Sequence, residues 1–513
     1  MCWPRRTSPL RSGFSTDMAR RSVLIFLPDM FSARNFLFTP LWEELRRRKD
    51  ADIVMVTPSA FHRHAIEESG AENISWARLG DTDASIRSAA RRALRSPSSL
   101  RRLFRLLALR ISANVGRDLH ARIICRFNSV QAFATHRLKR DLPRREKLKQ
   151  YGEIGSLAWP FPKSRRLFQW MYRIATLQCW PVPEWAVNLF RSRSPDLAVV
   201  AYPQTYQGFA IARTAKRLDV SLLAYINSWD QPTTKGPLPT GFAGIMVWNQ
   251  RMKDELIRFH GVPETAVSAV GAPHHDLYRR EDVRDSREVF LRSLSLPTEA
   301  EILLYGTYNR RLGADEPAIA RHVAQRVSEG AFGQRVILLI RPHPKDREWR
   351  ERFGTLDSID RVQVLPSSQY GTSSEETPDR PDKDMRFLIN LLAHSDVVLN
   401  GPGTLALDAV AFDKPTVNIG FDGDRSLRYE HSIRFRYDFD HYAPVIETGG
   451  TWLVESYDEL DAAVRAYLAD PTRHAEGRQR LRDQYLEPLD GRASARIADA
   501  IFGTALGEEG EAT

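Results

Sequence analysis

The sequence predicts an α/β protein made of two doubly wound domains in series. Short apolar runs of strand length alternate with helical patterns along most of the chain, which is typical of parallel sheets covered by helices. A long Arg-rich insert interrupts this alternation in the first half of the chain. A polar, charged linker then precedes a second series of alternating strands and helices. At 513 residues the chain is also too long for one compact core.

The N-terminal domain is predicted over residues 18–278. It opens with a strand over 22–28, a polar loop over 29–35 and a helix from about 38 to 48, and a second strand follows over 52–58. The basic, helical insert occupies about 84–194. Four further predicted strands lie at 196–202, 220–226, 244–248 and 266–270.

The C-terminal domain is predicted over residues 297–480, after a linker over 279–296. A C-terminal helix over 481–506 and an acidic tail over 507–513 close the chain, and residues 1–17 are expected to be a disordered extension. The predicted strands lie at 302–305, 335–340, 362–365, 396–399 and 416–419. The predicted helices lie at about 317–329, 385–393, 405–412 and 457–468.

The composition favours an anionic partner, because Lys and Arg number 74 against 64 Asp and Glu. We expect phosphates or acidic lipid and no nucleic acid. Nine arginines and no acidic residue lie between Asp83 and Asp118. A helix there, with Leu and Phe on one face and Arg on the other, fits an anionic membrane surface, and it fits equally well a helix that packs on the core.

No apolar window is long enough for a spanning helix, and the N-terminus lacks the apolar core of a signal peptide. Three widely spaced cysteines give no disulfide framework. We therefore expect a cytoplasmic protein, with a peripheral position on the inner membrane surface as the further expectation from the basic insert.

The segment 395–420 reads as strand, glycine loop, helix and strand. Gly401 and Gly403 end the first strand, and Thr404 is expected to cap a helix that reaches about Phe412. Asp408 lies one turn later on the same face as Thr404. This pattern predicts a pyrophosphate at Gly403 and Thr404 and ribose hydroxyls at Asp408. The alternative is an ordinary βαβ unit in which the glycines only turn the chain.

Two further strand ends carry polar groups. Arg341 and His343 follow a buried strand, between prolines that stiffen the exit, and a phosphate is the natural partner of this pair. Gly306 and Thr307 end the preceding strand and are predicted to line the same donor site. The alternative is a surface Arg and a structural His in a tight turn.

The N-terminal domain is predicted to hold the acceptor. Asp230 is a candidate general base, because burial beside Trp229 would raise the pKa of its carboxyl group; an Asp-containing turn is the alternative. Asp29 is the second candidate base, and Arg34 and Asn35 from the same segment are predicted to orient a hydroxylated substrate.

His274 is a further predicted acceptor-side residue, at the end of the last N-terminal strand. It begins the run His274-His275-Asp276, whose composition suggests a metal site. Three adjacent residues do not easily converge on one ion, so no metal is predicted.

These motifs together resemble GT-B-fold glycosyltransferases. The residues that carry the resemblance are Trp248-Asn249, Val270 to Asp276, Arg341 to Pro344, Gly401 to Thr404 with Asp408, and Lys414-Pro415. Within this class the sequence is most similar to bacterial surface-carbohydrate enzymes and the related CDP-glycerol glycerophosphotransferases. The resemblance implies two Rossmann-like domains facing a cleft, with a nucleotide-diphosphate donor in the C-terminal domain and the acceptor in the N-terminal one.

The resemblance implies that Arg341 and His343 meet the donor phosphates, that Gly403 and Thr404 cradle the pyrophosphate, and that Asp408 takes the ribose hydroxyls. Because this chain lacks the two serines usual near Gly403 in glycerophosphotransferases, we expect metal-independent transfer of a sugar from a nucleotide-diphosphate donor to a glycan or lipid-linked acceptor, without a cofactor. The alternatives are a CDP-glycerol-type glycerophosphotransferase, a UDP-sugar 2-epimerase and a non-catalytic, membrane-associated partner of a glycan assembly complex.

Overall fold

The computed structural model describes residues 20–57, 72–80, 182–234, 238–308, 315–344, 346–366, 381–427, 429–439 and 441–503. The predicted extension over 1–17, the basic insert up to residue 181 and the acidic tail lie outside these ranges. No helix of the described part of the chain is long and apolar enough to cross a membrane.

The N-terminal domain contains a seven-stranded, entirely parallel sheet with the order β3-β2-β1-β4-β5-β6-β7. Its inner strands are buried on both faces, so they read as continuous apolar runs. The strands are β1 (Arg21–Phe26), β2 (Ala51–Thr57), β3 (Ile74–Arg78), β4 (Leu197–Ala201), β5 (Ser221–Tyr225), β6 (Gly244–Val247) and β7 (Val267–Ala269).

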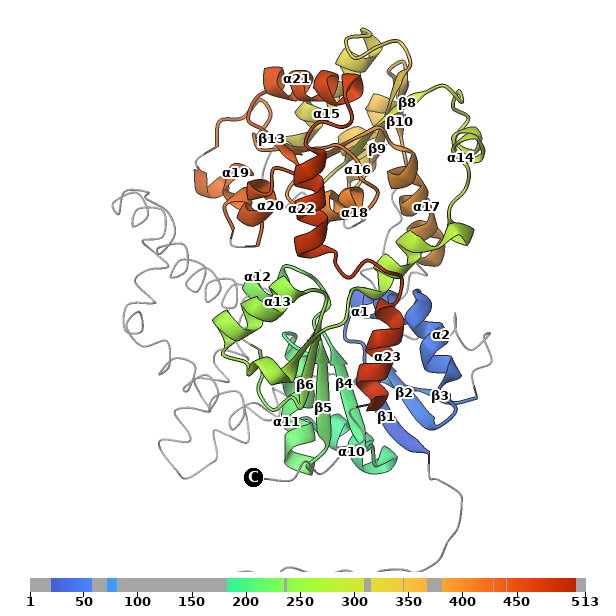
Figure 1. The fold of residues 1–513 in the computed structure, drawn as a ribbon, viewed down its shortest axis with the longest axis vertical. Coiled ribbons are helices and arrows are strands. Elements are labelled where there is room, and N and C mark those ends of the chain that lie inside the picture. The colour runs from blue at the N-terminus through green and yellow to red at the C-terminus, as the bar shows by residue number, and fades with distance from the viewer. Residues whose placement is uncertain are drawn as a thin grey trace, which may run out of the picture.

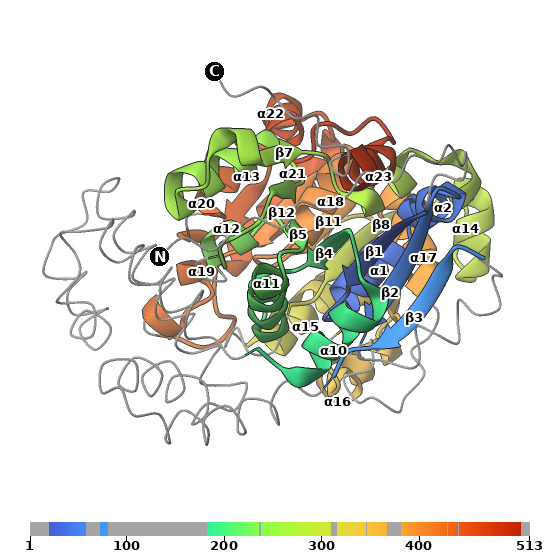
Figure 2. The same cartoon turned by 90° about the horizontal axis from the view of Figure 1, so that it is seen from below.

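Helices cover both faces of this sheet. Alternate side chains of β1 enter two different clusters: Val23 and Ile25 pack toward α1, α2 and α13, whereas Leu24 and Phe26 pack toward α10 and α11. Figure 2 shows these two helical layers from below. The helices are α1 (Met30–Leu37), α2 (Pro40–Arg47), α10 (Glu184–Arg193), α11 (Tyr206–Leu218), α12 (Gln231–Thr234) and α13 (Gln250–Glu255).

The predicted polar loop over 29–35 is wrong, because this segment is the helix α1. The Asp29 carboxylate caps that helix: its Oδ1 accepts hydrogen bonds from the backbone N of Ser32 at 2.8 Å and from the Ser32 hydroxyl. An Asp followed by two apolar residues resembles a strand exit, but here it is an N-cap.

The C-terminal domain contains a six-stranded parallel sheet with the order β10-β9-β8-β11-β12-β13. The strands β8, β9 and β11 lie at its centre, so the three strand ends that carry the predicted donor residues are neighbours. The strands are β8 (Glu301–Gly306), β9 (Val336–Arg341), β10 (Val362–Val364), β11 (Val397–Asn400), β12 (Thr416–Ile419) and β13 (Trp452–Val454).

The helices of this domain surround the sheet, above the N-terminal domain in Figure 1. The short helix α14 lies in the connection between the domains. The helices are α14 (Arg287–Ser293), α15 (Glu316–Ser328), α16 (Trp349–Phe353), α17 (Pro381–His394), α18 (Leu405–Ala411), α19 (Arg434–Tyr437), α20 (Ala443–Glu447), α21 (Tyr457–Ala469) and α22 (Ala475–Tyr485).

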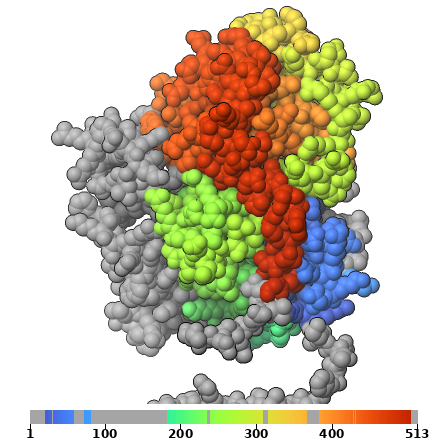
Figure 3. Space-filling view, in the orientation of Figure 1, coloured from blue at the N-terminus to red at the C-terminus, as the bar shows by residue number. Residues whose placement is uncertain are grey.

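The last helix, α23 (Ala493–Gly503), crosses back to the N-terminal domain, as the red segment in Figure 3 shows. Arg21 donates to the carbonyl of Phe502 at 3.0 Å, and Arg48 pairs with Asp499. The buried Asp276 accepts from the first two N–H groups of α23, those of Ala493 at 2.9 Å and Ser494 at 2.7 Å. The chain therefore links the domains twice.

Replacing Asp276 with Ala is expected to destabilise the protein by about 2 kcal/mol, because two buried N–H groups lose a charged acceptor. Chemical denaturation measures this. Asp499→Ala is the matched control: it breaks the pair with Arg48, in which the Asp499 side chain is 70% exposed, and should cost about 0.5 kcal/mol or less. Equal costs for the two variants would contradict the anchoring role of Asp276.

Candidate active site between the two domains

The glycine loop packs closely on its neighbours. A Cβ atom at Gly401 would lie 2.3 Å from the ring of Tyr308, so this position favours glycine. At Gly306, at the end of β8, such an atom would lie 2.0 Å from a methyl group of Leu405, which would have to move. At Gly403 the nearest atom to such a Cβ is Asn400 Oδ1 at 3.9 Å, an ordinary van der Waals contact. The loop therefore joins the ends of β8 and β11 tightly.

Thr404 does not cap α18, and the prediction that it does is wrong. Its backbone is already helical, and its side chain makes no capping hydrogen bond. Instead, the hydroxyl accepts a hydrogen bond at 3.2 Å from the indole Nε1 of Trp229, which belongs to the N-terminal domain. The Trp229 ring in turn lies against Tyr442 of the C-terminal domain, with ring centroids 5.7 Å apart. The loop is thus held by side chains from both domains.

Arg341 and His343 lie beside the glycine loop, because β9 pairs with β8 and Arg341 is level with Gly306. The Arg341 guanidinium pairs with Asp384 of α17 at 3.2 Å, and the side chain is 12% exposed. The Thr307 hydroxyl accepts from the backbone N of His343 at 2.9 Å, which fixes the exit of the strand. The structure therefore brings the predicted donor residues to one edge of the sheet.

Asp408 is buried, and the Tyr278 hydroxyl donates to its Oδ1 at 2.9 Å. Burial raises the pKa of the Asp408 carboxyl group to about 6, although the Tyr278 hydrogen bond and the charges of Arg34 and Arg341 oppose this rise. Asp408 comes from the C-terminal domain, whereas Tyr278 comes from the 3-10 segment Pro273–Arg279. The pair therefore crosses the domain boundary.

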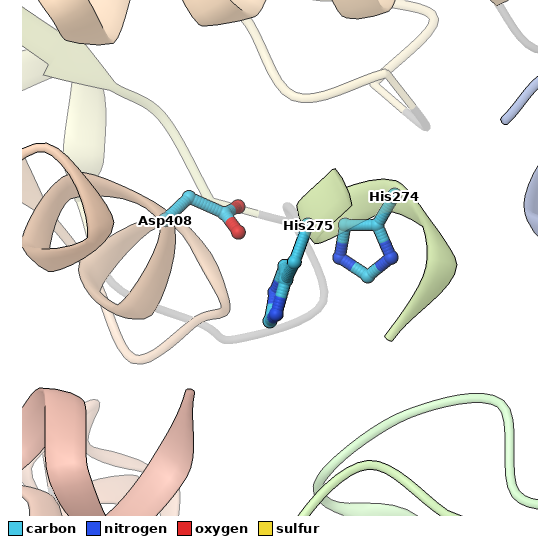
Figure 4. Close-up of side chains that lie close together, drawn as sticks. All are labelled: His274, His275 and Asp408. Carbon is cyan, nitrogen blue, oxygen red and sulfur yellow. The ribbon is translucent and has the colours of Figure 1, made fainter. Parts of the chain in front are cut away.

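His274 and His275 lie against Asp408, and Figure 4 shows the Asp408 carboxylate directed toward the His275 ring. Both rings are buried. Burial lowers the pKa of His275 to about 3, and it lowers the pKa of His274 well below the usual value. Both rings are therefore neutral at pH 7. Within the described residues, His274 Nδ1 and His275 Nε2 have no hydrogen-bond partner.

The ligand atoms of His274, His275 and Asp408 lie within 4.8 Å of one another, a spacing at which three side chains can hold a metal ion. Two cations act on this cluster: the charge of Arg34 lowers the pKa of both histidines, and the charges of Arg34 and Arg341 lower that of Asp408. Asp276 takes no part in this cluster, since it binds α23.

The acceptor-side residues form a buried polar network. The Asn35 amide donates to Asn227 Oδ1 at 2.6 Å, and the Asn227 amide donates to the Ser32 hydroxyl at 3.2 Å. Ser32 in turn donates to Asp29. These bonds join the helix α1 to the loop that follows β5.

Asp230 is bound within its own turn. Its Oδ1 accepts from the Ser228 hydroxyl at 2.5 Å, and its Oδ2 accepts from the Thr234 hydroxyl at 2.8 Å. The structure thus gives both predicted bases, Asp29 and Asp230, hydrogen bonds at the start of a helix. Asp230 lies next to Trp229, which contacts the glycine loop, whereas Asp29 is linked through Ser32 to Asn227.

Several residues of this site are not predicted by the sequence. The sequence indicates Trp229 only as a neighbour of Asp230, and it does not predict that Tyr278 binds Asp408 or that Asp384 pairs with Arg341. Tyr278 lies two residues after the His-His-Asp run, in the same 3-10 segment. A helical turn predicted over this run would have placed Tyr278 near the histidines. For Asp384, the sequence carries no signal that pairs it with Arg341.

Comparison with solved structures identifies the fold. The chain is similar to S. aureus MnaA in a co-structure with UDP, at 12% identity, with 94% of this chain and 96% of that chain covered and a TM-score of 0.50. It is also similar to a Listeria monocytogenes protein named as a UDP-N-acetylglucosamine 2-epimerase, at 14% identity, 94% and 96% coverage and a TM-score of 0.51. These likenesses confirm the predicted two-domain, GT-B-like α/β fold.

No curated protein matches the sequence. The family model for CDP-Glycerol:Poly(glycerophosphate) glycerophosphotransferase matches residues 245–503. The match begins in β6 and ends in α23, so it includes the His274-His275 pair, Arg341, the glycine loop and Asp408. It supports the glycerophosphotransferase alternative better than the main expectation of sugar transfer. The chain belongs to the CDP-glycerol:poly(glycerophosphate) glycerophosphotransferase family.

Proposed function

We propose that this protein transfers a glycerol phosphate, or a closely related polyol phosphate, from a CDP-linked donor to a hydroxyl group of a cell-surface polymer or its lipid-linked precursor. The observation that carries the proposal is the family match over residues 245–503, which contains the groups that face the domain boundary from both sides. The concentration of Arg34, Arg341 and neutral histidines around Asp408 supports an anionic substrate there.

The proposed reaction is a displacement at phosphorus. The acceptor oxygen forms a bond to the β-phosphorus of the donor, the bond between that phosphorus and the bridging oxygen breaks, and CMP leaves with the electron pair. The acceptor proton passes to a base. Charge develops on the phosphoryl oxygens and on the leaving phosphate, so fixed cations and hydrogen-bond donors near them lower the barrier.

We assign the groups of the C-terminal domain to the donor. Arg341 and His343 bind phosphate oxygens at the end of β9, next to Gly306 and Thr307 at the end of β8. Thr404 donates to a phosphate oxygen beside Gly403, at the end of β11. Asp408 accepts from the ribose hydroxyls through its second oxygen, because the Tyr278 hydroxyl occupies the first.

We assign the N-terminal domain to the acceptor. Asp230 is the proposed base, because it is adjacent to Trp229 and so belongs to the turn that contacts the glycine loop. Asp29 is the second candidate. Arg34, Asn35 and His274 lie on the acceptor side, and the charge of Arg34 extends to Asp408.

The test is incubation of the purified protein with CDP-glycerol and with UDP- and GDP-linked sugars, with and without a glycerol phosphate oligomer as acceptor. Acceptor-dependent release of CMP from CDP-glycerol is the expected result. Release of UDP or GDP from a sugar donor would show sugar transfer instead, and conversion of UDP-N-acetylglucosamine to its 2-epimer without acceptor would show epimerisation. Turnover of no donor would contradict a catalytic role.

A further inference from the structure

Trp229 reaches from the N-terminal domain into an aromatic pocket of the C-terminal domain. Its side chain is 4% exposed. The indole ring meets His441 with centroids 5.1 Å apart, and it meets Tyr442 and Tyr485 at 5.7 Å each. Tyr442 is itself held by a hydrogen bond from its hydroxyl to Asn418 Oδ1 at 3.2 Å. The ring is therefore fixed beside the glycine loop by packing on several sides.

The hydrogen bond between Trp229 and Thr404 has a fixed direction. An indole N–H can only donate, so the Thr404 hydroxyl oxygen must be the acceptor in this 3.2 Å contact. A hydroxyl group that accepts one hydrogen bond keeps its own proton for another partner. Within the described residues the Thr404 hydroxyl makes no second hydrogen bond, and it does not cap α18.

The position of Thr404 suggests the missing acceptor. Thr404 follows the end of β11, and β11 pairs with β8, which in turn pairs with β9. The hydroxyl therefore belongs to the same sheet edge as Arg341 and His343, where the proposed donor phosphate lies. A phosphate oxygen, which can only accept, is the complementary partner for a hydroxyl proton.

The polar network of the N-terminal domain holds the turn that presents Trp229. Gln231 Oε1 accepts from the backbone N of Asn227 at 2.9 Å, which closes the turn around Trp229, and the Gln204 amide donates to the Gln231 carbonyl at 3.1 Å. Asn35 fixes Asn227 from the other side. These groups are buried, so the turn is rigidly supported.

We propose that Trp229 is a positioning residue for the transfer reaction: its N–H occupies one lone pair of the Thr404 hydroxyl oxygen and thereby orients the hydroxyl proton toward a phosphate of the bound donor. This inference rests on the proposed function, because it needs a phosphate at the glycine loop. The indole belongs to the N-terminal domain, which is the proposed acceptor domain. The contact between Trp229 and Thr404 therefore lets that domain contribute to donor binding.

The direct test is Trp229→Phe, which keeps an aromatic ring in the pocket and removes the N–H donor. The dissociation constant of CDP-glycerol, measured by calorimetry, is expected to rise about 3- to 10-fold, the usual effect of one hydrogen bond between neutral groups. The KM for the acceptor should not change. Trp452→Phe is the matched control, because Trp452 packs on Tyr467 and His474 at the far edge of the C-terminal sheet.

A double-mutant cycle separates positioning from general packing. In a Thr404→Ala background, Trp229→Phe should cause no further loss of donor affinity, because the hydroxyl on which it acts is gone. Thr404→Ser should keep most of the affinity, since it keeps the hydroxyl. Equal and additive losses from the two substitutions, or unchanged affinity in Trp229→Phe, would overturn the inference.

Failure of the proposed function is a separate outcome. If the wild-type protein binds UDP or a UDP-sugar but no CDP-linked donor, the proposed substrate is wrong, and the same cycle with UDP as ligand decides the role of Trp229. Wild-type protein that binds neither nucleotide would overturn both proposals.

Discussion

Replacing Asp408 with Ala is expected to abolish binding of the CDP-linked donor, with a loss of at least about 100-fold in affinity. The reason is that a carboxylate that accepts from two ribose hydroxyls provides two charge-assisted hydrogen bonds, each worth about 1.5–3 kcal/mol in a buried site. Calorimetric titration with CDP-glycerol and with CDP measures the loss. An affinity within about threefold of the wild type would remove the ribose assignment.

The matched variant is Asp408→Asn, which keeps the size of the side chain and an oxygen for the Tyr278 hydroxyl. If ribose recognition needs the ionised carboxylate, donor affinity in the wild type should fall below pH 6, by about tenfold per pH unit, because the pKa of Asp408 in the folded protein is about 6. Asp408→Asn should bind weakly at every pH and show no such dependence.

The same pKa gives an independent prediction of stability. Burial raises the pKa of Asp408 from the ordinary value of 3.8 to about 6, so the folded state binds this proton more tightly than the unfolded state does. The favourable contribution is complete below pH 4 and is lost as the pH rises through 6. At pH 8 Asp408→Asn should therefore be more stable than the wild type, by about 2–3 kcal/mol at most, while its donor binding is lost.

Thermal and chemical denaturation at pH 5 and pH 8 checks this. A variant that gains stability and loses binding separates a binding role from a structural one. A variant that loses stability at pH 8 would show instead that the ionised Asp408 supports the fold through Tyr278.

Replacing Arg341 with Ala is expected to lower kcat/KM for transfer by about 10²- to 10³-fold. A fixed guanidinium near the phosphates stabilises the charge that develops in the transition state, and loss of one such group commonly costs about 3–4 kcal/mol. The fall should include kcat and not only KM, because the charge on the phosphoryl oxygens changes during the reaction. Steady-state kinetics of CMP release measures it. Arg341→Lys should recover only part of the rate, since an ammonium cannot form the two parallel bonds of a guanidinium.

Asp384 supplies the control for this prediction. It pairs with Arg341 at 3.2 Å and lies on α17, so Asp384→Asn leaves the guanidinium in place and weakens only its orientation. We expect a smaller loss, about 10-fold or less. If Asp384→Asn were as damaging as Arg341→Ala, the pair would act as a structural unit, and Arg341 would no longer be assigned to the phosphate.

The alternation of apolar runs and helical patterns predicted the architecture correctly, because strands that are buried on both faces carry a strong signal. The sequence did not predict β3 and β13, which form the outer edges of the two sheets and are short and only partly buried. The prediction of a loop over 29–35 is wrong for another reason. An Asp after a strand fits both a loop and the N-cap of a helix, and only the hydrogen bond from the Ser32 backbone N decides between them.

The candidate donor residues could be found from the sequence because they follow directly from strand ends, and parallel strands end at one edge of a sheet. By itself the sequence determined that edge, the fold class and the family resemblance. Only the tertiary structure decided that Trp229 contacts Thr404, that Tyr278 binds Asp408, and that His274 and His275 face a carboxylate 133 or more residues away in the chain. These contacts cross the domain boundary, and local propensity and periodicity carry no information about which side chains meet there.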